Sequence, residues 1–148
     1  MWNPSKSVKL SSICTKIAIA LVVAFAFAMP FMVNSYVGYA GKNPEVAFPL
    51  MVTLYACIVP GAVSLFCLDR LLANIEKNEV FIESNVRLLR FISWCCFAVS
   101  AILFVSGFYY IFLLIVAVAA AFLGLILRVV KNVIEQAVHI KRENDFTI

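Results

Sequence analysis

The sequence predicts an all-α membrane protein: a bundle of four transmembrane helices, with a helical hairpin between the second and third helices and an extension of the fourth. Three observations predict this fold. First, 64% of the 148 residues are hydrophobic, 14% are charged and the mean hydropathy is +1.01, values that a soluble domain does not reach. Second, four apolar runs of about 17 to 22 residues can each cross a hydrocarbon core of about 30 Å. Third, the basic residues gather at the ends of these runs.

The four predicted spans are residues 13–33, 47–68, 91–107 and 109–127. They take up most of the chain, so we expect residues 1–148 to form a single integral membrane domain. The first span follows Lys6 and Lys9 and begins like a secretory signal peptide. It continues past Pro30, which is longer than the usual apolar core of such a peptide, so we expect it to stay uncleaved.

Small residues recur at intervals of four on the first and fourth spans, a spacing that lets a second helix approach closely in a membrane. We expect these two spans to pack against each other, with a homodimer through the same residues as the alternative. The residues are Ala20, Ala24 and Ala28 on the first span, and Ala117, Ala120, Ala121 and Gly124 on the fourth.

Pro60 and Gly61 lie near the middle of the second span. Proline lacks an amide hydrogen and clashes with the carbonyl four residues before it, so we expect a kink there. Such a kink can open a cavity, or it can simply let the helix bend to pack. The packing interpretation is favoured.

A polar segment, residues 69–90, separates the second and third spans, and we name it the polar hairpin. Asn78 and Glu79 predict a turn, with helix on each side continuing into the neighbouring span. Ser84 or Asn85 is expected to cap the helix that follows.

The fourth helix is expected to continue beyond the membrane as a C-terminal extension, residues 128–148. Apolar residues keep helical spacing as far as Ile140, and Lys131 with Glu135 forms an i,i+4 pair. We expect this helix to stop near Asn144, and residues 145–148 to be extended.

The basic residues predict the orientation. Of the twelve, eleven lie in the N-terminal segment, the polar hairpin and the C-terminal extension, and only Lys42 lies in the first loop. Because basic residues concentrate on the cytoplasmic side, we expect both termini and the polar hairpin in the cytoplasm.

The spans carry little chemistry. No acidic, basic or histidine residue lies in the middle of a span, which argues against a proton-coupled transporter and a hydrolase. The span hydroxyls of Thr53, Ser64, Ser93 and Ser100 are expected to bond carbonyls of their own helices. The five cysteines form no CxxC motif and the single histidine, His139, has no partner at a recognisable spacing. We therefore expect no enzymatic activity, no cofactor and no metal.

Direct nucleic-acid binding is not expected either, because no block of like charge is long enough to follow a phosphate backbone. The polar hairpin and the C-terminal extension emerge from the same side of the membrane. Phe81 and Ile82 could therefore meet Phe146 and Ile148. Two compatible interpretations follow: the tail seals the bundle, or this surface binds a partner.

Two stretches of the chain, NIEKNEVFIESNVRLLRFISW (residues 74–94) and EQAVHIKRENDFTI (residues 135–148), carry a resemblance. They resemble an uncharacterised family of small bacterial four-span membrane proteins, whose hairpin reads I-x-x-G/N-x-x-F-T-x-x-N-x-x-x-L-R and whose tail ends close to E-N-D-L-T-V/I. The matching residues are Ile75, Phe81, Asn85, Leu89 and Arg90 in the hairpin, and Glu143, Asn144, Asp145, Phe146, Thr147 and Ile148 in the tail. Ile82 replaces the usual Thr or Ser, and Phe146 replaces Leu.

In that family the gene often lies beside one for a small Cro/CI-like helix-turn-helix DNA-binding protein. The resemblance thus implies a protein of the bacterial inner membrane that binds or regulates a transcription regulator. The implied partner-binding residues are Phe81, Asn85, Leu89, Arg90, Glu143, Asn144, Asp145, Phe146, Thr147 and Ile148. One alternative is a small exporter or immunity-type protein for a hydrophobic peptide or drug, working at the Pro60 kink. Another is a structural subunit of a larger membrane complex, marked by exposed small-residue stripes.

Overall fold

The computed structural model describes residues 4–147, and the regular secondary structure of this part of the chain is all helical. Its four long helices are α1 (Pro4–Tyr39), α2 (Ala47–Glu76), α3 (Glu83–Ser106) and α4 (Ile111–Phe146), and a short 3-10 helix, η1 (Pro44–Val46), precedes α2. All four long helices have the length and hydropathy of membrane spans. The predicted all-α fold with four candidate spans is confirmed.

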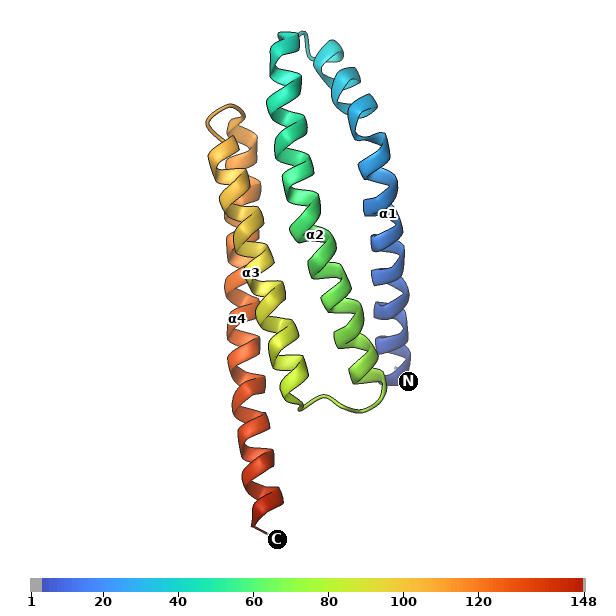
Figure 1. Ribbon diagram of the computed structural model, residues 1–148, viewed down its shortest axis with the longest axis vertical. Helices are drawn as coiled ribbons and strands as arrows, with labels where there is room; N and C mark the ends of the chain where they lie inside the picture. The colour runs from blue at the N-terminus through green and yellow to red at the C-terminus, as the bar shows by residue number, and fades with distance from the viewer. Residues whose placement is uncertain (1–3, 148) are drawn as a thin grey trace.

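The four helices stand side by side in chain order, each antiparallel to the one before (Figure 1). Among the described residues, contacts between long helices join only α1 with α2, α2 with α3, and α3 with α4, and the last pair is the most extensive. The bundle is therefore open, with α1 and α4 at its two ends.

The predicted packing of the first span on the fourth is wrong. Ala20, Ala24 and Ala28 are all exposed on α1, and α1 makes no contact with α4 in residues 4–147. Instead α1 packs on α2 through the buried side chains of Met29 and Val33 and of Val37 further along the helix. These side chains recur every four residues and offer more surface than alanine for dispersion contacts.

Two small residues of the fourth span do lie in a helix contact, but the partner is α3. Ala117 and Gly124 are buried, and their carbonyl oxygens accept hydrogen bonds from Ser100 Oγ (2.8 Å) and Ser93 Oγ (2.9 Å). The expectation that these two serines bond their own helix is wrong, because close approach of α3 and α4 puts a neighbouring carbonyl within reach. Ala120 and Ala121 are half-buried.

Thr53 and Ser64 behave as expected, since Thr53 Oγ1 donates to Pro49 O and Ser64 Oγ to Gly61 O within α2. Thr53 Oγ1 also lies 2.7 Å from Ser106 Oγ of α3. α2 remains helical through Pro60, and the kink stays a prediction.

The turn between α3 and α4 depends on Gly107. A Cβ atom on this buried residue would lie 2.4 Å from Leu114 Cδ2, far inside van der Waals contact. Nearby, Tyr110 Oη donates to Val46 O at 3.2 Å, and Lys42 Nζ lies 4.5 Å from the Tyr110 ring centre. These contacts join this turn to the loop between α1 and α2.

Candidate functional site: the polar hairpin and the C-terminal extension

The polar hairpin contains a tight turn between α2 and α3. α2 ends at Glu76, and Asn78 adopts a left-handed conformation with φ of 62°. The amide of Asn78 donates to Ile75 O and that of Glu79 donates to Asn74 O, each at 3.0 Å. This is a Schellman motif, which needs a left-handed residue that glycine or asparagine tolerates. The turn predicted at Asn78 and Glu79 is confirmed.

The side chain of Asn85 holds the rest of the turn in place. It is fully buried, its Nδ2 donates to Glu79 O (2.8 Å) and Val80 O (2.9 Å), and its Oδ1 accepts from Asn74 Nδ2 (2.7 Å). Both amide hydrogens and the amide oxygen are thereby used. One side chain fixes the loop and joins it to the last turn of α2.

The predicted cap of the third helix is wrong. Ile82 occupies the N-cap position of α3, and no side chain makes a capping hydrogen bond there. Ser84 is exposed, and Asn85 turns back to bond the loop carbonyls. Asn85 therefore shapes the hairpin. Because its side chain is buried, the polar atoms of its amide must find hydrogen-bond partners within the protein.

Burial divides the residues implied as a partner-binding surface. Asn85 and Leu89 are buried and therefore belong to the interior of the hairpin. Phe81 is 47% exposed, and Arg90 is exposed. Glu143, Asn144, Asp145, Phe146 and Thr147 are all exposed, and Ile148 lies outside the described residues.

The tail does not meet the hairpin in the way predicted. α4 continues as a helix to Phe146, two residues beyond the predicted stop, and carries the C-terminal end past the hairpin turn (Figure 1). The Phe146 side chain is 84% exposed, so it does not cover Phe81. The helix continues because each added residue completes a further backbone hydrogen bond, and no breaker follows Asn144.

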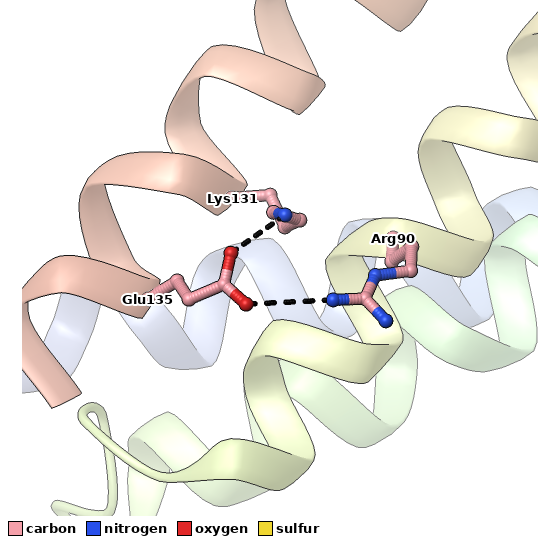
Figure 2. A network of polar contacts seen from close by, with 3 residues as sticks. All are labelled: Arg90, Lys131 and Glu135. Carbon is pink, nitrogen blue, oxygen red and sulfur yellow. Dashed lines mark hydrogen bonds and ion pairs between the residues drawn. The ribbon is translucent and has the colours of Figure 1, made fainter. Parts of the chain in front are cut away.

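Ion pairs tie the C-terminal extension to the start of α3. Arg142 Nη1 lies 3.0 Å from Glu83 Oε1, and Arg90 Nη2 lies 3.4 Å from Glu135 Oε1. The predicted Lys131–Glu135 pair is confirmed, with Nζ 2.7 Å from Oε2. Figure 2 shows Lys131 and Arg90 approaching the Glu135 carboxylate from α4 and α3.

The hydrogen bond from Lys131 is the main cause that lowers the pKa of the Glu135 carboxyl. The positive charges of Lys131 and Arg90, with a contribution from His139, act in the same direction, while partial burial opposes them. Glu135 is therefore held ionised as the centre of a small charge network.

A cleft of about 280 Å³ lies between the start of α3 and the C-terminal extension. Its lining combines three arginines, one histidine, two carboxylates and two valines: Arg87, Arg90, Arg142, His139, Glu83, Glu135, Val86 and Val138. Within residues 4–147, no three Cys, His, Asp or Glu side chains are placed to hold a metal ion. The groups on this face can form ion pairs and hydrogen bonds.

Sequence comparisons agree with this architecture. Residues 38–148 match the family model described as "Protein of unknown function (DUF2975)". The chain is also 26% identical over 159 residues to the uncharacterized membrane protein YoaS of Bacillus subtilis (strain 168), with 95% of this chain and 99% of that protein covered. No solved structure matches the chain. The matched region contains both the polar hairpin and the C-terminal extension and is well over half of the sequence, so the chain belongs to the DUF2975 family.

Proposed function

We propose that this protein is a non-enzymatic membrane protein that holds a soluble cytoplasmic protein on its C-terminal extension. The observation that carries the proposal is a row of apolar side chains on the extension that no other helix covers in the described part of the chain. Val129, Val133 and Ile140 are 62%, 60% and 60% exposed. They fall at i, i+4 and i+11, which places them on one face of the helix.

This row differs from the apolar surface of the spans. It follows Arg128, Gln136 lies within it, and Asn132 and Glu143 lie beside it on the helix, so charged and polar residues accompany it. An amphipathic helix with an exposed apolar face is a common ligand for a hydrophobic groove on another protein. The row therefore favours a protein partner.

The cleft beside the row supplies a second determinant. Its three arginines, Arg87, Arg90 and Arg142, outnumber its two carboxylates, Glu83 and Glu135, which favours an acidic segment of the partner. The resemblance to a family whose genes often neighbour a small helix-turn-helix regulator suggests such a regulator as the partner. Binding would keep it at the membrane and away from its DNA.

The experiment is a capture from membranes of the tagged full-length protein, with bound proteins identified by mass spectrometry. The test variant carries Val133→Ser and Ile140→Ser, and the control carries Lys141→Ser, at an exposed position on another face of the same extension. We expect the regulator with the wild type and the control, but not with the test variant. Equal recovery with all three proteins would contradict the proposal.

A second candidate function has one observation in its favour. An apolar groove of about 510 Å³ runs between α1 and α2, beside the Pro60–Gly61 pair, and is lined by Leu21, Val22, Phe25, Met29, Leu54, Cys57, Ile58 and Gly61. A groove of this kind suits a hydrophobic peptide or drug, as an exporter or immunity-type protein would need.

Filling the groove separates the two candidates. Beyond its chain neighbours and the nearby backbone of its own helix, a Cβ on Gly61 would have no atom of the described residues within 4 Å, so Gly61→Leu adds bulk to the groove wall without a clash against another element. The exporter would be favoured if this variant lost resistance to a hydrophobic agent and if neither the wild type nor the variant captured the regulator. Unchanged regulator capture would favour the first function.

A further inference from the structure

We infer that a small basic pocket between α3 and α4 binds the phosphate group of an anionic phospholipid. The pocket has a volume of about 50 Å³ and lies where the C-terminal extension leaves the fourth span. Three cationic side chains from two helices, Arg90, Arg128 and Lys131, line it together with Ser93 and Trp94. The pocket shares Arg90 with the cleft beside the proposed partner surface, but its other lining residues are not part of that cleft, and the inference stands whether or not a protein binds there.

The charge of the pocket is not balanced by its neighbours. Glu135 is the carboxylate beside it, bonded closely to Lys131 at 2.7 Å and loosely to Arg90 at 3.4 Å. One carboxylate against three cations leaves an excess of positive charge. That excess calls for an anion, and a phosphate group is the anion that a membrane surface presents.

Arg128 is the residue best placed to take this anion. In the part of the chain that the structure describes, its contact is with an aromatic ring: its Cζ lies 5.8 Å from the centre of the Trp94 ring. A guanidinium placed over an aromatic ring in this way leaves its N–H groups free to donate. Arginine donors match the oxygens of a phosphate group in pairs.

Trp94 marks the depth of the pocket. It is 58% exposed and Phe91, one turn before it on α3, is 60% exposed. Exposed tryptophan at the end of a span typically lies at the level of the lipid headgroups. The residues beyond Trp94 on α3 are those of the third span, while Arg90 lies on the polar side. The pocket is thus at the depth of lipid phosphates.

The dimensions agree with a headgroup and not with a larger ligand. A water molecule needs about 10–15 Å³ measured in the same way, so about 50 Å³ holds the oxygens of one phosphate group. Ser93 contributes only the wall, because its hydroxyl already donates to Gly124 O at 2.9 Å. Arg90, Arg128 and Lys131 are left as the donors.

The test uses lipids that quench tryptophan fluorescence. The chain has two tryptophans, so a Trp2→Phe background leaves Trp94 as the single reporter. The full-length protein is placed in bilayers in which either phosphatidylglycerol or phosphatidylcholine is brominated. The ratio of the two quenching affinities measures the preference for the anionic headgroup, and we expect at least about fivefold, the effect of one basic residue near the surface.

Three substitutions assign the preference to the pocket. Arg128→Gln is expected to lower the ratio about fivefold, to near one, and Arg128→Lys to retain most of it. The control, Lys141→Gln, removes the same charge from an exposed position on the same extension outside the pocket, and it is expected to leave the ratio unchanged. Circular dichroism of each variant checks that the helices are intact.

Three results would overturn the proposal. The first is a ratio near one in the parent protein, and the second is an equal fall in Lys141→Gln and Arg128→Gln, which would indicate general surface charge. The third is loss of the preference in millimolar inorganic phosphate at constant ionic strength, which would identify a soluble phosphate group as the ligand. A preference that resists phosphate and depends on Arg128 supports the lipid.

Discussion

The side-chain amide of Asn74 donates a hydrogen bond to Oδ1 of Asn85 at 2.7 Å, joining the last turn of α2 to the first turn of α3. Asn85 is fully buried and bonds two loop carbonyls with its own amide. The conformation of the polar hairpin thus depends on one polar side chain at the centre of the turn, and all three of its hydrogen bonds are made inside the protein.

We predict that Asn85→Ala lowers the free energy of unfolding by about 3 kcal/mol. The substitution leaves the carbonyls of Glu79 and Val80 and the amide of Asn74 without this partner, and each unsatisfied group costs about 1–3 kcal/mol. The measurement is unfolding in mixed detergent micelles followed by circular dichroism. Asn132→Ala, at an exposed position on α4, is the control and should change stability by less than about 0.5 kcal/mol.

We predict opposite outcomes for two glycines. Gly107→Ala places a Cβ 2.4 Å from Leu114 Cδ2, so Leu114 must leave its position, at about 1–3 kcal/mol of stability. Gly61→Ala meets nothing within 4 Å inside a helix, and alanine there is favoured by up to about 1 kcal/mol. The thermal unfolding midpoints of both variants test this prediction. A Gly107→Ala variant more stable than the wild type would contradict this description of the turn.

The helices could be predicted from the sequence, but their neighbours could not. Hydropathy and length locate a span without reference to the rest of the protein, whereas packing depends on which surfaces meet. Met29 and Val33, buried against α2, are chemically like Phe27 and Phe31, which are 84% and 79% exposed. Side chains that face lipid and side chains that pack between helices are equally apolar, so hydropathy does not distinguish a helix contact from a lipid contact.

The site was predictable where its contacts are local. The Lys131–Glu135 pair follows from an i,i+4 spacing, whereas Arg90 reaches Glu135 across 45 positions of sequence. Asn85 belongs to a recognisable motif, but the prediction that it caps α3 is wrong. An asparagine near the start of a helix has the same sequence signature whether its side chain caps the helix or bonds the preceding loop. Its partner Asn74 carries no signal until the turn brings the two helices together.

We predict that Ser93→Ala weakens the contact between α3 and α4 by about 0.6 kcal/mol, the average value of a hydrogen bond between helices in a membrane. The Ser93 hydroxyl is buried and donates to Gly124 O. Ser64→Ala is the matched control, because the Ser64 hydroxyl donates to Gly61 O of its own helix. Unfolding titrations of both variants are compared, and an equal loss in the two would contradict a role for Ser93 between helices.

We predict that Glu135 makes the stability of the C-terminal extension depend on pH. Its carboxyl pKa is lowered below the ordinary value of 4.5, first by the hydrogen bond from Lys131 and then by the charges of Lys131 and Arg90. The unfolded chain therefore binds a proton more readily than the folded one as the pH falls below about 4.5. The stabilisation is complete above that value and disappears as the pH falls through the lowered pKa of the folded protein.

The measurement is the thermal unfolding midpoint of the wild type and of Glu135→Gln from about pH 7 to about pH 3. We expect the wild type to be the more stable of the two at neutral pH, and the difference to shrink only below about pH 4.5, because only there does the Glu135 carboxyl begin to bind a proton, first in the unfolded chain. Glu83→Gln tests specificity: it breaks the separate pair with Arg142, so it should leave the difference made by Glu135 in place. A difference that stays constant to pH 3 would mean that Glu135 stabilises the extension by packing and not by its charge.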